Sequence, residues 1–386
     1  MNRRELLRGL SLTLPLMSIG RLYAAPAGSP RLLIVFLRGG YDCLNMLVPY
    51  ASDDYYSLRP NIAIPKPPES LQLDADWALT PALAASAAPL FASKQLAFIP
   101  FAGTDDLSRS HFETQDSIEL GQPGDHADLR SGFLARLAGV LTGQRAIAFT
   151  DSLPVSFRGS SDIPNISLKS VGKPTFDARQ AAILSDMYAH HPLHGQVQEG
   201  LELRQEVSVA MADEMQQANR DAVTAKGFEL EAQRIGRLMR TDYALGFVDI
   251  GGWDTHVNEN QTLAANLDSL GRGLQSLARE LGPEWPNTVV VVVSEFGRTF
   301  RENGNRGTDH GHGSVYWVAG GAISGGRVVG RQQRIERATL FQDRDLPVLN
   351  DYRGVIGGLV RSMWNLSDSQ LQQVFPGAAP QDLALT

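Results

Sequence analysis

The sequence contains almost no cysteine: Cys43 is the only one among 386 residues. A single cysteine excludes an intrachain disulfide framework, so stability has to come from a large hydrophobic core, with or without a metal. Runs of lysine or arginine are also missing, and the formal net charge is -7. Because an acidic chain without a basic run is a poor binder of nucleic acid, we expect no nucleic-acid partner.

Long hydrophobic runs are absent too. After the N-terminal segment no stretch approaches the roughly 18 consecutive apolar residues of a transmembrane helix, so we expect no membrane span in the mature chain. Glycine (37) and proline (21) are near their average use, which excludes fibrous and disordered classes. What remains is an ordinary globular composition, 43% hydrophobic and 20% charged, sufficient for one large domain or two modest ones.

Residues 1–27 have the pattern of an export signal. Arg3 and Arg4 form a twin-arginine pair, a short apolar run follows, and residues 25–27 (Ala-Pro-Ala) offer a small-x-small cleavage site. This pattern predicts a Tat-type signal peptide and export through the twin-arginine pathway, to the periplasm or outside the cell. The mature α/β domain would then span residues 28–386. The alternative is an uncleaved amphipathic N-terminus.

Apolar runs typical of buried parallel strands alternate with helical patterns along the mature chain. The predicted strands span residues 32–37, 96–99, 146–149, 244–250, 288–293 and 314–319. The predicted helices span residues 80–94, 112–120, 130–141, 263–281 and 352–364. This alternation predicts a three-layer α/β/α sandwich around a mostly parallel sheet. Residues 178–240 have no convincing strand and predict a helical excursion, either a cap over the sheet or a long crossover.

Parallel sheets bind ligands beyond the carboxyl ends of their strands, and polar motifs follow the predicted strands here. Asp42 lies in a glycine-rich loop after the first strand, where it is a candidate metal ligand or a helix cap. After strand 96–99, Ser110 lies near the first turn of a helix, where free N–H groups bind anions. Flanked by Arg109 and His111, it is a candidate nucleophile. The alternative is an ordinary helix cap.

Two further loops contain residue types that ligate metals. Asp254 and His256 follow strand 244–250 next to a glycine pair, and Asp with His is a common zinc or manganese ligand pair. Glu295 emerges from the most hydrophobic strand, where a charge needs a partner or a metal. Arg298 is either that partner or a fork for a substrate oxyanion.

The strongest local signal is the peptide 307–313, which contains Asp309, His310 and His312 among three glycines. A peptide this rich in glycine has few side chains that could pack in a hydrophobic core. Its residues indicate metal ligation or acid/base chemistry. The alternative is a flexible loop with solvated histidines.

Together these motifs resemble the bacterial Tat-exported family known as domain of unknown function 1501. The resemblance lies in residues 37–45, 109–112, 251–256, 294–299, 307–311 and 345–353. It covers essentially the whole mature chain, and the order and number of the motifs make it specific. That family is grouped with the alkaline phosphatase and sulfatase superfamily.

The resemblance implies a three-layer α/β sandwich with one or two divalent metals (Zn, Mn, Ca or Mg) beside a Ser, Thr or Cys nucleophile. Ser110 falls in the nucleophile position. The implied ligand positions are taken by Asp42, Asp254, His256, Glu295, and His310 or His312, with Asp309 beside them.

The sequence departs from the superfamily pattern in three places. Glu295-Phe296 stands where an Asp-His pair commonly follows the late strand, and Asp42 lies five residues beyond Leu37 rather than at the strand end. Cys43 is followed by Leu-Asn-Met, which is not the maturation motif of formylglycine sulfatases. The sequence therefore excludes sulfatase chemistry by formylglycine.

Three functions follow as hypotheses. The first is a metal-dependent hydrolase of a phosphate or sulfate ester, small or polymer-borne, in which Arg109, His111 and Arg298 hold the oxyanion. The second is a non-catalytic exported binding or assembly partner of another exported protein, which keeps the fold, with or without a metal, but has no turnover. The third is a metal-dependent isomerase or phosphomutase, which export disfavours.

Overall fold

The computed structural model describes residues 28–124, 128–160, 162–168, 178–210 and 227–386. The predicted signal peptide, residues 1–27, lies outside this part of the chain, so the export of the protein remains a prediction.

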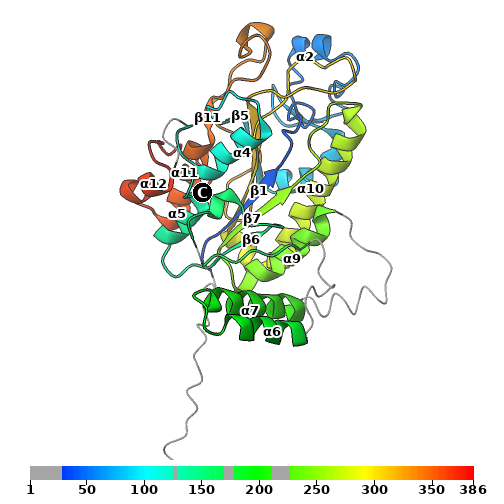
Figure 1. Ribbon diagram of the computed structural model, residues 1–386. Helices are drawn as coiled ribbons and strands as arrows, with labels where there is room; N and C mark the ends of the chain where they lie inside the picture. Colours follow the sequence, from blue (N-terminus) through cyan, green and yellow to red (C-terminus); the bar gives the residue numbers. More distant parts are fainter. Residues whose placement is uncertain (1–27, 125–127, 161, 169–177, 211–226) are drawn as a thin grey trace, which may run out of the picture.

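A mostly parallel, eight-stranded sheet lies at the centre of the molecule (Figure 1). Its strand order is β10-β5-β9-β8-β1-β7-β6, and β11 also pairs with β5. The strands are β1 (Arg31–Leu37), β5 (Leu96–Gly103), β6 (Ala146–Phe149), β7 (Leu245–Ile250), β8 (Thr288–Ser294), β9 (Ser314–Ala319), β10 (Arg327–Val328) and β11 (Asn350–Asp351). All six predicted strands are confirmed, and the two short edge strands were not predicted.

The direction of the strands decides where the polar loops meet. β1 pairs in parallel with β7 and β8, whereas β9 runs antiparallel to both β8 and β5. The carboxyl ends of β1, β5, β7 and β8 therefore lie along the same edge of the sheet as the amino end of β9.

Two hydrophobic cores separate the sheet from its helices, because successive side chains of a strand point to opposite faces. Leu33 and Val35 of β1 belong to one core, and Leu32 and Ile34 belong to the other. Helices α9 (Phe228–Thr241) and α10 (Glu259–Leu281) cover the first face. The second face is covered by α4 (His111–Leu120), α5 (Phe133–Val140), α11 (Tyr352–Trp364) and α12 (Asp368–Val374). The predicted three-layer α/β/α sandwich is confirmed (Figure 1).

The helical patterns are confirmed where one apolar stripe runs without interruption. On α10, the leucines at positions 263, 267, 270, 274, 277 and 281 form such a stripe, and all of them are buried. The predicted helix over residues 80–94 is instead split into η1 (Pro81–Leu83) and α3 (Ala88–Ala92). Pro89 explains the split, since proline fits the first turn of a helix but not its interior.

The predicted helical excursion consists of α6 (Ala178–Tyr188) and α7 (His194–Ala210), followed by α9. Figure 1 shows α6 and α7 side by side at the opposite end of the molecule from α2 (Asp53–Leu58). α9 packs against α10 in the helical layer, so among the described residues of the excursion α6 and α7 are the helices that extend from the sandwich.

The remaining elements are short. A second, antiparallel sheet of three strands has the order β2-β4-β3. These are β2 (Leu47–Val48), β3 (Leu71–Gln72) and β4 (Ala78–Leu79), and the other 3-10 turns are η3 (Val155–Phe157), η4 (Gly282–Asn287) and η5 (Arg337–Thr339). Within the described ranges, no helix combines the length and the apolar character that crossing a membrane requires.

Candidate functional site

The polar motifs gather at one edge of the sheet because β9 reverses direction. β8 ends at Ser294 and β9 begins at Ser314 on the same edge, so the loop between them turns back over that edge. This loop carries the glycine-rich peptide 307–313 to the carboxyl ends of β1, β5 and β7. Motifs that lie before and after different strands thereby become neighbours.

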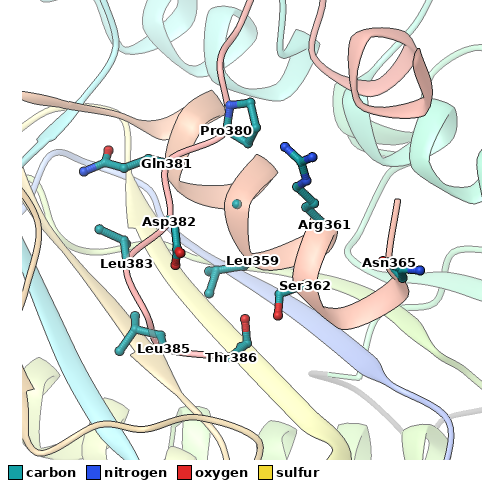
Figure 2. A pocket seen from close by; sticks show the side chains of 11 residues that line it. Leu359, Arg361, Ser362, Asn365, Pro380, Gln381, Asp382, Leu383, Leu385 and Thr386 are labelled. Carbon is teal, nitrogen blue, oxygen red and sulfur yellow. The ribbon is translucent and has the colours of Figure 1, made fainter. Parts of the chain in front are cut away.

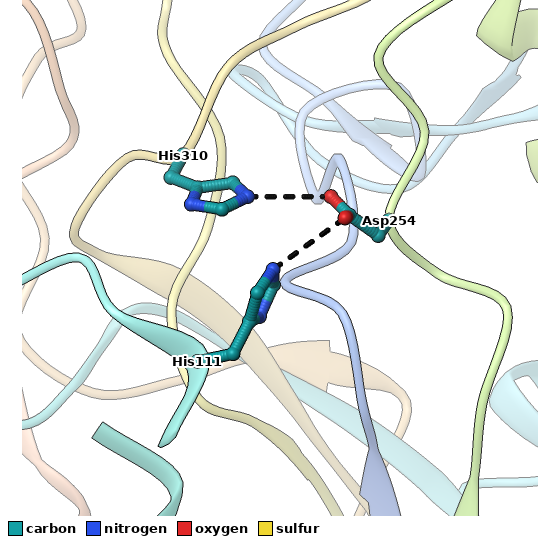
Figure 3. A group of neighbouring side chains, drawn as sticks. All are labelled: His111, Asp254 and His310. Carbon is teal, nitrogen blue, oxygen red and sulfur yellow. Dashed lines mark hydrogen bonds and ion pairs between the residues drawn. The ribbon is translucent and has the colours of Figure 1, made fainter. Parts of the chain in front are cut away.

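Three side chains at this edge form a candidate metal site (Figure 3). His111 begins α4, Asp254 follows β7, and His310 precedes β9; their ligand atoms all lie within 4.8 Å of one another. His111 Nε2 lies 3.5 Å from Asp254 Oδ2, and His310 Nε2 lies 3.3 Å from Asp254 Oδ1. Two imidazoles and a carboxylate are a zinc donor set that leaves a fourth position open.

Glu295 orients the first of these histidines. Its Oε1 lies 2.8 Å from His111 Nδ1 and accepts hydrogen bonds from Gln115 Nε2 and the Gly39 amide, each at 2.8 Å. The hydrogen bond to Glu295 raises the pKa of His111. Burial alone would raise the pKa of Glu295, but its hydrogen bonds to His111 and Gln115 lower it. Glu295, expected to be a ligand, therefore lies behind the histidine and holds its ring.

The resulting geometry passes a test of whether a metal would fit. With the proton of His111 on Nδ1 facing Glu295, its Nε2 carries the lone pair, and this buried atom has no hydrogen-bond partner. His310 is arranged in the same way, with Nδ1 lying 3.1 Å from the carbonyl of Arg109 and Nε2 facing Asp254. Carboxylate and carbonyl partners behind the ligating histidines are typical of metal sites.

Arg298 holds the third member of the group. Its Nη2 lies 2.6 Å from Asp254 Oδ1 and 2.6 Å from the carbonyl of Gly39, and its Nη1 lies 3.2 Å from the carbonyl of Thr308. Burial would raise the pKa of Asp254, but the hydrogen bond and charge of Arg298 lower it. Arg298 is fully buried, with its donors directed at the protein. This favours a role in joining the loops over both expected roles, a salt bridge to Glu295 or a contact with a substrate oxyanion.

The structure separates Asp42 from this group. Both oxygens of Asp42 accept from the buried guanidinium of Arg59, at 2.5 and 3.0 Å, so its position is that of a structural ion pair. Glu259 lies beside the pair, and its Oε2 accepts a hydrogen bond of 2.8 Å from Thr308 Oγ1. Burial, and then the charge of Asp42, raise the pKa of Glu259 to about 9. A neutral Glu259 thus connects α10 to the loop that carries His310.

The other predicted ligands, His256, Asp309 and His312, lie at different distances from the group formed by His111, Asp254 and His310. His256 adjoins the group, with Nε2 2.8 Å from Asp254 Oδ1 and 3.2 Å from His310 Nε2. Asp309 is exposed, and its Oδ1 lies 3.5 Å from His256 Nδ1. His312 packs its ring 5.0 Å from that of Phe341, and burial lowers its pKa to about 4. His312 therefore lies outside the candidate metal site.

Ser110 is the N-cap residue of α4, but its hydroxyl makes no capping hydrogen bond. The first N–H groups of a helix have no partner within the helix, so this end of α4 can accept an anion. Arg109 has a left-handed φ of 54°. Its guanidinium donates to Asp345 Oδ2 at 3.0 and 2.8 Å, so it is already paired.

Several residues that shape the site carried no motif in the sequence. They are Arg59, Gln115, Glu259 and Arg344. Gln115 alone had a usable signal, because it lies four residues after His111 and so on the same face of the helix. The others act through contacts between segments far apart in the chain, which no local pattern reveals.

Replacing Glu295 by glutamine should lower metal affinity about 10- to 100-fold, as is typical when a partner behind a ligating histidine is changed. Glutamine keeps the shape but removes the negative charge behind His111. Isothermal titration of the metal-free variant with Zn²⁺ measures the change. Glu113→Gln is the control, because it removes an exposed carboxylate from the first turn of the same helix. Equal affinity in the Glu295 variant would contradict the proposed orientation of His111.

A hollow of about 360 Å³ lies away from the candidate metal site. Figure 2 shows it between α11 and the C-terminal segment, where Leu359, Ser362 and Leu385 line it. None of the predicted site residues contributes to its lining. The volume of this hollow is therefore no guide to the functional site, because the candidate metal ligands lie at the carboxyl ends of the strands.

The family to which the chain belongs follows from a comparison of its sequence with family models. Residues 29–375 match the family described as "Protein of unknown function (DUF1501)". The chain belongs to this family. The resemblance expected from the motifs is thereby confirmed across nearly the whole chain. No curated protein matches the sequence of this DUF1501 member.

Solved structures similar to this DUF1501 protein include members of the alkaline phosphatase superfamily. A 2-O GAG sulfatase is 11% identical, with 88% of this chain and 71% of that chain covered and a TM-score of 0.41. The soluble domain of lipooligosaccharide phosphoethanolamine transferase A from Neisseria meningitidis is 14% identical (76% and 78% covered, TM-score 0.35). An alkaline phosphatase superfamily protein from Vibrio parahaemolyticus is 12% identical (77% and 62% covered, TM-score 0.35). These likenesses concern the fold.

Proposed function

We propose that this protein is an exported, metal-dependent hydrolase of a phosphate or sulfate ester, carried by a small molecule or a polymer. The observation that carries the proposal is the buried Nε2 atom of His111, which has no hydrogen-bond partner and faces Asp254 and His310. The preceding residue, Ser110, has a hydroxyl that makes no capping hydrogen bond. Zn²⁺ suits this donor set best, and Mn²⁺, Ca²⁺ and Mg²⁺ are the other candidates. Export through the twin-arginine pathway to the periplasm is part of the proposal.

The residues of the site have separable roles in this reaction. A bound divalent metal would supply positive charge that polarises the ester. Arg298 keeps Asp254 ionised and Glu295 fixes the ring of His111, so the ligands are arranged before substrate arrives. The free N–H groups at the start of α4 would bind the other oxygens of the phosphate or sulfate group.

Ser110 would be the nucleophile. Its hydroxyl oxygen would attack the phosphorus or sulfur atom, the bond from that atom to the alcohol oxygen of the substrate would break, and the proton of the serine hydroxyl would end on the departing alcohol. Water would then release the acid group from the serine and restore the hydroxyl. Two observations support this role: Ser110 directly precedes His111, and its hydroxyl is not used as a helix cap.

A specific observation favours a second candidate function. The two arginines expected to hold an oxyanion, Arg109 and Arg298, already have protein partners in Asp345 and Asp254. A protein that keeps the fold and the metal ligands, but whose two expected oxyanion arginines are already paired, fits a binding or assembly role on an exported partner.

Hydrolysis of a panel of phosphate and sulfate esters by the metal-loaded mature protein separates the two candidates. The hydrolase predicts turnover of at least one ester, which stops on addition of a chelator and returns with the metal. Full metal loading without turnover of any ester would favour the binding protein.

A further inference from the structure

A second hollow, of about 210 Å³, adjoins the loop that carries His310. Its walls are residues 299–302, the loop 337–344 and Asp309, which precedes His310 in the chain. Arg344, in the wall, donates from Nη2 to the carbonyl of His310 at 2.8 Å. Since a water takes about 30 Å³, the hollow holds a substituent rather than a whole large molecule.

The charged side chains that line this hollow differ in whether they have hydrogen-bond or ion-pair partners in the protein. Glu302 accepts hydrogen bonds from the backbone amides of residues 61–62, at 3.0 and 3.1 Å. Arg337 lies 4.0 Å from Asp343, and both side chains are exposed. Within the described part of the chain, the guanidinium of exposed Arg301 has neither an ion pair nor a hydrogen bond. The lining contains as many carboxylates (Glu302, Asp309 and Asp343) as guanidinium groups, so its capacity for an anion rests on Arg301.

The loop that forms one wall is held in a strained conformation tied to the catalytic segment. Gln342 and Asp343 have left-handed φ angles of 53° and 55°. Such conformations are unfavourable in non-glycine residues and cluster at ligand sites. Arg109 donates to Gln342 Oε1 at 2.6 Å, so the residue before Ser110 fixes this wall.

We propose that this hollow binds a second anionic group of the substrate, against Arg301 and Arg337, while the reacting ester lies at the metal site. The inference rests on the proposed function and narrows the substrate to molecules with two negative groups, such as sulfated, phosphorylated or carboxylated oligomers. Guanidinium groups bind these oxyanions by paired hydrogen bonds. Because the whole chain carries a net charge of -7, local arginines have to supply this affinity.

Binding of short dextran sulfate chains to the metal-loaded protein, measured by isothermal titration, tests the proposal. We expect saturable binding, with no binding of unsulfated dextran. Arg301→Ala should weaken it about tenfold or more, the loss typical of a charge-assisted hydrogen bond. The variant should fold, since Arg301 is exposed and unpaired. Arg130→Ala is the matched control, because it removes an arginine that is 90% exposed and outside the hollow.

The outcomes separate this inference from the function on which it rests. Binding that depends on Arg301 but is accompanied by no turnover would contradict the hydrolase and support the anion subsite. Equal affinities of Arg301→Ala and the wild type, the same loss in Arg130→Ala, or no saturable binding by the wild type would overturn the subsite. Inorganic sulfate, which is small enough to bind at the metal alone, should bind Arg301→Ala and the wild type equally.

Discussion

Ser110→Ala should lower kcat by at least about 10³-fold while leaving the metal content unchanged. The expected loss is that of an enzyme deprived of its nucleophile. Metal should stay bound, because Ser110 is not among the three clustered ligands. Stability should change little, since the hydroxyl makes no capping bond and the usual cost of about 1 kcal/mol for a lost cap does not apply.

The measurement is the steady-state rate on whichever ester the wild type hydrolyses, with metal content and thermal unfolding recorded on the same preparations. Ser117→Ala is the control, because it removes a hydroxyl from the same helix; that hydroxyl lies 3.4 Å from Thr104 Oγ1. Turnover that survives in Ser110→Ala would remove this residue as the nucleophile. An equal loss in Ser117→Ala would point to a general disturbance of α4.

The elements that the sequence predicts correctly are those with an uninterrupted apolar pattern. Strands β1 and β8 are continuous apolar runs, and α10 has a single stripe of leucines, so burial fixes each element without help from distant segments. The helix expected over residues 80–94 fails because Pro89 interrupts it, a local signal that outweighs the apolar pattern.

The direction of β9 could not be read from its composition, because a buried strand is apolar whichever way it runs. The 19 residues between β8 and β9 contain no helix, and the missing crossover helix was the available sign of an antiparallel pair. This reversal brings His310 to the site, since in an all-parallel sheet the peptide before β9 would lie at the far edge.

The candidate site could be predicted as a set of loops but not as a set of roles. Asp254 and His111 lie together at the carboxyl ends of strands, where the strand-end rule places polar loops, and the reversal of β9 adds His310 to them. Whether a carboxylate binds the metal or holds another residue in place depends on the side chains that pack against it. Glu295 faces the Nδ1 of a histidine, and Asp42 faces the guanidinium of Arg59. These partners come from segments distant in the chain.

The account's central claim is a metal site built on Asp254, and removing that residue together with His256 should abolish binding. Asp254 offers one oxygen to each histidine of the group, whereas His256 is the adjoining imidazole that could compensate for its loss. The change also leaves the buried Arg298 without its carboxylate, so the fold has to be monitored by thermal unfolding. Asp254→Asn keeps an oxygen for Arg298 but removes the charge, and it should also lose metal.

Elemental analysis of the purified protein, beside the Asp254→Ala/His256→Ala variant, tests this claim most directly. A His190→Ala/His191→Ala variant, which removes two exposed histidines, serves as the control. The account predicts near-stoichiometric divalent metal in the wild type and the control, and its loss in the Asp254/His256 variant. A folded wild type that binds no divalent metal, even after incubation with each ion, or equal metal in the Asp254/His256 variant, would contradict it.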